Sequence, residues 1–300
     1  MNNNITFLFY HYGKIPKYLE CAIEHVRLFN PRAEIYLITD GIKDTSKIDR
    51  FNVLRFQMEE FQSEELSLFK NFYQHVSCFN EKYERFVLER WFATEIIRKQ
   101  RPNRSYVMLD SDVAVFGRVD DLINKLPDFP IVLSGRNPHF TFINGEISEF
   151  LQFITDYYQD DQRISAARLR FNEQKNDEQL YTLGEMQFLF EYLDLERGMG
   201  MYDVDTDFGF VDGNIHEPQG FDCLQLRRRQ RKIVYWKTED GRTIPYFKRG
   251  GQFVNAFILH FQGPGKRVFF RFNGGNFFNS KIGLFLLNQV FQSRWLANLM

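Results

Sequence analysis

In the first half of the chain, short apolar runs typical of strands alternate with longer segments whose apolar positions have helical spacing. Short apolar, β-prone runs occupy residues 5–10, 34–39 and 105–109. Between them, residues 16–29 and 81–100 carry apolar side chains at the three- and four-residue spacing of a helix. Strands alternating with helices predict βαβ units, and hence an α/β fold with an open, mixed, mainly parallel sheet flanked by helices. In such a sheet, ligands bind beyond the carboxyl ends of the strands.

The second half of the chain is less regular, but several segments keep a clear pattern. In chain order we expect a strand at 131–134, a helix at 148–159, a polar surface excursion at 160–178, a helix at 185–195, a hairpin of 233–236 with 243–247, a strand at 257–260 and an amphipathic helix at 282–300. No internal repeat and no Gly/Ser-rich or Pro-rich linker divides the sequence. We therefore expect one α/β domain at residues 1–270, followed by a C-terminal helical extension at 271–300.

The composition is that of an ordinary globular protein with an excess of aromatic residues. Hydrophobic residues make up 44% and charged residues 26%, which excludes a disordered or coiled-coil chain. No run approaches the roughly 18 apolar residues of a membrane-spanning helix, and the start lacks the features of a secretory signal. Cys21, Cys78 and Cys223 form neither a disulfide framework nor a zinc pattern. A reducing, cytoplasmic location is the expectation. The 34 Phe residues could fill the core, stack on bases and sugars, or face a membrane.

The net charge of -1 argues against a nucleic-acid partner. It averages an acidic first part and a basic last part, since residues 220–300 contain 14 Lys or Arg and 3 Asp or Glu. A basic section suggests an anionic ligand such as a diphosphate, or an anionic membrane surface. A solvated basic face is the alternative.

The clearest chemical pattern is LDSD at residues 109–112, directly after the apolar run at 105–109. The carboxylates of Asp110 and Asp112 repel each other, so a cation is the usual means of neutralising such a pair. A hard divalent ion that binds one or two carboxylates and phosphate oxygens fits this pattern. The alternative is a solvated turn in which Asp110 caps neighbouring backbone groups.

A second pattern, HFQGPGK, runs from His260 to Lys266 after the expected strand at 257–260. A glycine turn at Gly263 lets backbone N–H groups approach a ligand, and Lys266 follows within reach of an anion. An isolated histidine is more often structural than a ligand. This one shares a strand end with a loop suited to phosphate, which favours a functional interpretation.

Together, the two patterns resemble the metal-dependent, nucleotide-sugar-using glycosyltransferases of the GT-A fold, most nearly the glycogenin and bacterial lipopolysaccharide galactosyltransferase group. The resemblance implies that Asp112 and His260 ligate Mn²⁺ (or Mg²⁺), that Asp110 contacts the metal or ribose, and that Lys266 holds the diphosphate. It also implies a nucleotide-binding half at about residues 1–126 and an acceptor half at about 127–270. The remaining residues expected to contact a donor such as a UDP-sugar are Tyr10, Tyr12, Asp40, Arg90, Ser111, Asn144 and Gly263.

The sequence departs from the family at two places. Arg267 and Val268 stand where the family has Pro-Trp after the lysine, and the family's Asp-Gln helix start has only a loose counterpart at Glu185. Catalysis with retention needs no strong base, whereas inversion needs a carboxylate. For inversion, the candidates are Glu185, Asp212 and Asp207.

The expected activity is transfer of a sugar from a nucleotide diphosphate sugar to a glycan or lipid-linked glycan, in bacterial surface glycan or lipopolysaccharide synthesis. One alternative is a phosphatase of the haloacid dehalogenase type with Asp110 as nucleophile. Another is a non-catalytic protein that binds nucleotide sugars. The apolar positions of 282–300 allow peripheral contact with the inner membrane surface, core packing or a dimer contact, of which the last two fit its weakly basic polar face better.

Overall fold

The computed structural model describes residues 5–41, 46–102, 104–174, 181–225, 230–239 and 242–269, so the extension expected at 271–300 lies outside the described residues. The helices in these ranges are α1 (Lys17–Phe29), α2 (Glu64–Phe72), α3 (Glu81–Gln100), α4 (Val119–Ile123), α5 (Ser148–Gln159), α6 (Asp161–Glu173), α7 (Glu185–Asp194) and α8 (Lys266–Phe269), with 3₁₀ turns η1 (Ser46–Phe51), η2 (Met58–Glu60) and η3 (Gly263–Gly265). None of the described helices is long and apolar enough to cross a bilayer.

The strands are short, and most are buried. In chain order they are β1 (Ile5–His11), β2 (Glu34–Thr39), β3 (Leu54–Gln57), β4 (Ser105–Leu109), β5 (Val113–Val115), β6 (Ile131–Ser134), β7 (Asn137–Ile143), β8 (Met199–Tyr202), β9 (Asp205–Thr206), β10 (Gly209–Val211), β11 (Cys223–Gln225), β12 (Gln230–Lys232), β13 (Tyr235–Glu239), β14 (Arg242–Arg249) and β15 (Gln252–His260).

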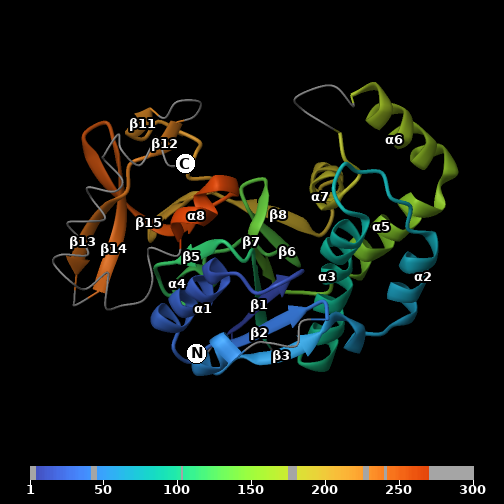
Figure 1. The fold of residues 1–300 in the computed structure, drawn as a ribbon, viewed down its shortest axis with the longest axis horizontal. Helices are drawn as coiled ribbons and strands as arrows, with labels where there is room; N and C mark the ends of the chain where they lie inside the picture. Colours follow the sequence, from blue (N-terminus) through green and yellow to red (C-terminus); the bar gives the residue numbers. More distant parts are fainter. Residues whose placement is uncertain are drawn as a thin grey trace.

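The central sheet has seven strands in the order β3-β2-β1-β4-β7-β6-β8. Strand β7 runs antiparallel to both of its neighbours, and the other adjacent pairs are parallel. The expected open, mainly parallel sheet flanked by helices is therefore confirmed (Figure 1). Strands from both sides of residue 126 form this one sheet, so the two expected halves share a core.

Successive side chains of β1 enter two different hydrophobic clusters. Phe7 and Phe9 pack in the cluster that contains α1, whereas Leu8 and Tyr10 pack in the cluster that contains α3. Adjacent residues of a strand point to opposite faces of the sheet, so both faces of β1 are covered. This explains why the strand is a continuous apolar run rather than an alternating one.

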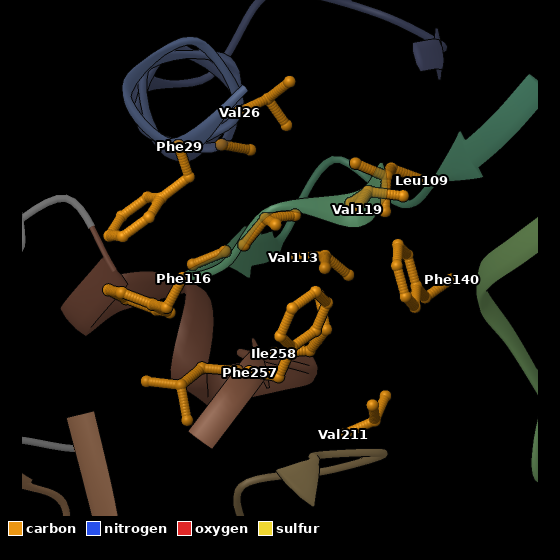
Figure 2. Packing of buried hydrophobic residues seen from close by; sticks show 14 of the residues in the cluster. Val26, Phe29, Leu109, Val113, Phe116, Val119, Phe140, Val211, Phe257 and Ile258 are labelled. Atoms are coloured by element: carbon orange, nitrogen blue, oxygen red, sulfur yellow. The ribbon is translucent and has the colours of Figure 1, made fainter. Parts of the chain in front are cut away.

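A second sheet joins the central one through β5, and its main path is β13-β14-β15-β10-β9. Strand β5 follows β4 after only three residues and pairs antiparallel with β15, which brings His260 opposite Val113. Figure 2 shows Phe140 of β7 together with Phe257 and Ile258 of β15 in the shared core, and the rings of Phe140 and Phe257 lie 6.4 Å apart. This junction places the end of β15 next to the end of β4.

One helix was not expected from the sequence, although the segment that contains it is largely exposed, as expected. The segment expected as a surface excursion at 160–178 contains the helix α6, which Asp160 caps by accepting hydrogen bonds from the backbone N–H groups of Gln162 and Arg163. Only Ile164 and Ala167 of this helix are buried, so its apolar face is too narrow to produce a helical pattern in the sequence. The predicted hairpin is confirmed, with Trp236 paired to Pro245 across β13 and β14.

Candidate metal and donor site

The candidate site is built where β4, β5 and β15 meet. Asp110, Ser111 and Asp112 form the turn between β4 and β5, at the carboxyl end of the parallel strands β1, β2 and β4. The turn closes with a hydrogen bond from the backbone N–H of Val113 to the carbonyl of Asp110. His260 is the last residue of β15, and the backbone N–H of Phe261 donates to the carbonyl of Asp112. Two segments 148 positions apart in sequence are thus hydrogen-bonded at one sheet edge.

The two carboxylates and the imidazole form one compact cluster. One ligand atom from each of Asp110, Asp112 and His260 lies within 4.8 Å of the others. His260 Nε2 lies 3.6 Å from Asp112 Oδ1, and Lys266 Nζ lies 3.2 Å from Asp112 Oδ2. Asp112 and His260 are buried, whereas Asp110 is partly exposed and opens the cluster to solvent.

In this cluster, Asp112 and its neighbours His260 and Lys266 stabilise each other's charged forms. Burial alone would raise the pKa of Asp112, but hydrogen bonding and charge from His260, together with the charge of Lys266, hold it well below its usual value. Burial alone would lower the pKa of His260, but Asp112 outweighs burial and raises it to about 8. Asp112 is therefore ionised at neutral pH, as a metal-ligating carboxylate must be.

The donor set fits a hard or borderline divalent cation. His260 Nδ1 lies 2.7 Å from the carbonyl oxygen of Gly213, and since a carbonyl only accepts, Nδ1 carries the proton. Metal binding requires that the ring release its other proton, and Nε2, which faces Asp112, is then the unprotonated nitrogen. An imidazole nitrogen together with two carboxylates suits Mn²⁺ and leaves coordination places for phosphate oxygens and water. Asp110, Asp112 and His260 are thus the residues that would hold the metal.

Arg90 connects this cluster to Glu185. Its Nε and Nη2 donate to the two oxygens of Glu185 at 2.7 and 2.6 Å, and its Nη1 donates to Asp110 Oδ1 at 3.0 Å. Burial lowers the pKa of Arg90, but the two carboxylates outweigh burial and raise it above its usual value. The indole N–H of Trp91 also donates to Glu185. Both oxygens of Glu185 are occupied, so the structure places this residue as the partner of Arg90 rather than as an available base.

Asp212, another expected catalytic carboxylate, lies behind His260. It is fully buried, its Oδ1 lies 2.5 Å from Lys232 Nζ, and its Oδ2 accepts from the backbone N–H of His260 at 3.2 Å. Asp207, the remaining candidate, precedes β10 whereas Asp212 follows it, so the two lie at opposite ends of that strand. The exposed Asp207 pairs with Lys125. Neither carboxylate is presented at the metal cluster.

The residues expected to contact the donor have different surroundings. Tyr10 is buried and its hydroxyl lies 2.8 Å from Thr94 Oγ1, so this side chain packs in the core. Tyr12 is half-buried and its ring contacts those of Tyr83 and Phe86, at 6.1 and 5.8 Å between centroids. Tyr12 therefore keeps an accessible aromatic surface at the end of β1.

Three further donor candidates lie at the expected edge. Asp40 is exposed directly after β2, and Ser111 is half-buried between the two aspartates. Gly263 begins η3 with φ of +58°, a conformation that glycine adopts without the strain other residues meet. The turn at Gly263 leads into α8, which begins with Lys266 and so places its ammonium against Asp112.

Asn144 is not brought to the cluster. Because β7 is antiparallel to β4, its C-terminal residue Ile143 pairs with Tyr106 near the start of β4, so Asn144 lies at the opposite edge of the sheet. The start of β7 comes to the cluster instead. The carbonyl of His139 accepts from the backbone N–H of Asp110 at 3.0 Å, and its ring is stacked on that of His260 with centroids 4.6 Å apart.

His139, Lys232 and Tyr83 lie at or behind the site but were not predicted from the sequence as site residues. Burial, together with the neighbouring His260, holds the pKa of His139 well below its usual value, so this ring is neutral. The ring of Tyr83 is partly exposed, and burial of its hydroxyl, together with the charge of Asp110, raises the pKa of that hydroxyl. No sequence motif carries these residues, because the direction of β7 and the path of β12 bring His139 and Lys232 to the site.

No protein-family model matches the chain, and no curated protein sequence matches it. Among solved structures, the chain is similar to the glycosyltransferase GlyE of Streptococcus pneumoniae, at 14% identity, over 69% of this chain and 47% of that chain, with a TM-score of 0.34. It is similar to mouse xyloside xylosyltransferase 1 at 9% identity, over 68% and 85%, with a TM-score of 0.45. It is also similar to the galactosyltransferase LgtC, a structure in complex with donor and acceptor sugar analogues, at 13% identity, over 65% and 72%, with a TM-score of 0.34.

These three proteins are glycosyltransferases. The chain spans less than half the length of the GlyE chain. All three TM-scores lie below 0.5.

Proposed function

We propose that this chain is a metal-dependent glycosyltransferase of the GT-A type, which moves a sugar from a nucleotide diphosphate sugar to a hydroxyl of an acceptor. The observation that carries the proposal is the cluster of Asp110, Asp112 and His260 with Lys266 beside it, at the carboxyl-end edge of an open α/β sheet. Ligands of such sheets bind at this edge. The cluster offers ligands for a cation and a separate fixed positive charge, which is the combination a diphosphate requires.

The reaction breaks the bond between the anomeric carbon of the sugar and the diphosphate oxygen, and forms a bond from that carbon to the acceptor oxygen, whose proton is released. A bound Mn²⁺ or Mg²⁺ would supply Lewis-acid stabilisation of the departing diphosphate. Lys266 adds positive charge at the same group, and the charge of Asp112 raises the pKa of Lys266 against the opposing effect of burial. Arg90 fixes the orientation of the Asp110 carboxylate.

A UDP-sugar is the donor that we propose. The half-buried ring of Tyr12 lies at the end of β1, beside the exposed Tyr83, and an aromatic face at this edge suits stacking by a nucleobase. For the acceptor, we propose a glycan or lipid-linked glycan of the bacterial cell surface, such as lipopolysaccharide, reached from the cytoplasmic side.

The phosphatase alternative fits the structure less well. A nucleophilic Asp110 would attack through a carboxylate whose Oδ1 already accepts a hydrogen bond from Arg90, and His260 and Lys266, which both lie against Asp112, would have no role in that chemistry. A binding protein with a decayed catalytic site is disfavoured because Asp110, Asp112, His260 and Lys266 are all present in one cluster.

The test is release of UDP from a panel of UDP-sugars, with and without Mn²⁺, for the wild type and the variants Asp112→Ala and Lys266→Ala. We expect each variant to lower metal-dependent kcat/KM by about 100-fold or more, because each removes charge stabilisation of the leaving group. Asp156→Ala, which removes an exposed carboxylate on α5, is the matched control and should retain wild-type turnover.

Three results would contradict the proposal. Full metal-dependent turnover by Asp112→Ala would remove that residue from the metal site. A phosphoryl group trapped on Asp110 would instead support the phosphatase. Tight UDP binding without turnover of any donor and acceptor pair would support the binding protein.

A further inference from the structure

A lysine is buried completely behind the metal cluster. Lys232, at the end of β12, has no exposed side-chain surface. Its Nζ lies 2.5 Å from Asp212 Oδ1, 2.6 Å from Gln219 Oε1 and 3.0 Å from the carbonyl oxygen of Asn214. Three acceptors therefore match the three N–H groups of the ammonium.

Three aromatic rings complete the surroundings of this lysine. Its Nζ lies 5.4, 5.8 and 5.4 Å from the ring centroids of Phe210, Phe221 and Phe247. Apolar side chains of similar volume in place of both Lys232 and Asp212 would cost little stability, because the desolvation of a buried ion pair offsets most of its attraction. The feature that needs an explanation is that all three acceptors belong to one segment, residues 212–219.

The same segment holds His260 from two sides. Asp212 Oδ2 accepts from the backbone N–H of His260 at 3.2 Å, and the carbonyl of Gly213 accepts from its ring Nδ1 at 2.7 Å. The backbone N–H of Ile215 donates to the carbonyl of His260 at 3.1 Å. Lys232 thus contacts the residues on each side of Gly213, namely Asp212 through its side chain and Asn214 through its carbonyl.

We propose that Lys232 is a positioning residue of the metal site, which acts on His260 through Asp212 and Gly213. By fixing Asp212 and Asn214, the ammonium sets the position of the Gly213 carbonyl, and this carbonyl directs His260 Nε2 towards Asp110 and Asp112. The inference rests on the proposed function, because it assumes that these three residues bind a divalent cation. Hydrogen-bond partners of a ligating histidine typically change metal affinity by 10- to 100-fold when they are removed.

The first experiment measures Mn²⁺ affinity without nucleotide, by electron paramagnetic resonance of the free ion, for the wild type, Lys232→Met and Asp212→Asn. We expect both variants to bind Mn²⁺ at least 10-fold more weakly than the wild type. Val234→Ala, which trims a buried side chain two residues from Lys232, is the control for a change in local packing and should keep wild-type affinity.

The outcomes separate the inference from the proposed function. If the wild type binds no Mn²⁺, or Asp112→Ala binds it as the wild type does, the proposed metal site fails. If Asp112→Ala loses binding while folded Lys232→Met keeps wild-type affinity, the metal site stands and the role of Lys232 is overturned. A loss in Val234→Ala equal to that in Lys232→Met would also overturn it, since packing alone would then explain the effect.

A second measurement starts from the wild type, where it can overturn the proposed orientation of His260 without any change at Lys232 or Asp212. In the wild type with Mg²⁺, a diamagnetic probe, ¹⁵N spectra of labelled histidine should show His260 with its proton on Nδ1, assigned by the signal that His260→Gln removes. In folded Lys232→Met, that signal should broaden or report a mixture of both tautomers. A wild-type signal with the proton on Nε2 would contradict the proposed orientation.

Discussion

Glu84, on the first turn of α3, carries a buried carboxyl group that none of the proposed chemistry uses. It packs against Gly184, where an added Cβ would lie only 2.6 Å from its Oε2. Burial, together with the charge of Glu185, raises the pKa of Glu84 from an ordinary value of 4.5 to about 7. The folded protein therefore binds this proton more tightly than the unfolded chain does. The resulting stability is fully present below about pH 4.5 and is lost as the pH rises through 7.

We predict that Glu84→Gln removes this loss of stability. The variant and the wild type should unfold with similar free energies at pH 4.5, and at pH 8 the variant should be more stable by at most about 3 kcal/mol. Urea denaturation at the two pH values measures the difference. Glu81→Gln, at an exposed position on the same turn, is the control. A gap between Glu84→Gln and the wild type that does not change with pH would show that Glu84 is not protonated preferentially in the folded state.

At the scale of the element, α3 and α6 differ in how much of their stability comes from packing. Helix α3 buries residues on several sides, among them Arg90, Trp91 and Thr94, so its position is fixed by the core and by Glu185. Helix α6 buries only Ile164 and Ala167. Its Asp160 cap, with hydrogen bonds of 2.9 and 3.1 Å to backbone N–H groups, therefore contributes a larger share of its stability.

We predict that Asp160→Ala weakens α6 by about 1 kcal/mol, the usual value of an N-cap. Hydrogen exchange should show faster exchange at amides of α6, with no change at amides of α3. Asp161→Ala is the matched control, because it removes the charge next to the cap but leaves both capping hydrogen bonds, and should cost only a few tenths of a kcal/mol. Equal effects of the two substitutions would mean that charge, and not capping, stabilises the helix.

At the scale of the whole molecule, the contact between the two sheets fixes the site, because it joins the end of β4 to the end of β15. Gly117 and Phe257 lie at this contact, where a Cβ on residue 117 would come within 2.2 Å of the Phe257 ring. The backbone N–H of Phe116 donates to the carbonyl of Phe257 at 2.8 Å. Phe257 is almost fully buried and lies among the core side chains drawn in Figure 2, so its ring cannot move aside freely.

We predict that Gly117→Ala lowers the free energy of unfolding by about 1–3 kcal/mol through overpacking. Because Phe257→Leu removes the ring atoms that clash, the double variant should be more stable than the sum of the two single effects implies. Urea denaturation of the four proteins tests this. Strict additivity would show that the two residues do not meet as described.

The sequence predicted most of the elements whose apolar pattern is strong. Glu34–Thr39, Glu81–Gln100, Ser105–Leu109, Ile131–Ser134 and Ser148–Gln159 begin and end as expected. Local hydrophobic periodicity decides such elements, because each buries a wide face against the core. The helix α6 was missed for the opposite reason, since few of its residues are buried.

The sequence by itself determined the α/β class and the four residues of the cluster, Asp110, Asp112, His260 and Lys266. Asp110 and Asp112 directly follow one strongly apolar strand, His260 ends another, and Lys266 comes after the loop that follows His260. Their positions near strand ends could therefore be inferred from neighbouring residues alone. The remaining features of the site depend on partners distant in sequence. Only the tertiary structure decided that Asn144 lies at the far edge, since that follows from the antiparallel pairing of β7. It also decided that Asp212 and Glu185 are held by Lys232 and Arg90, because burial and ion pairing depend on which elements pack together.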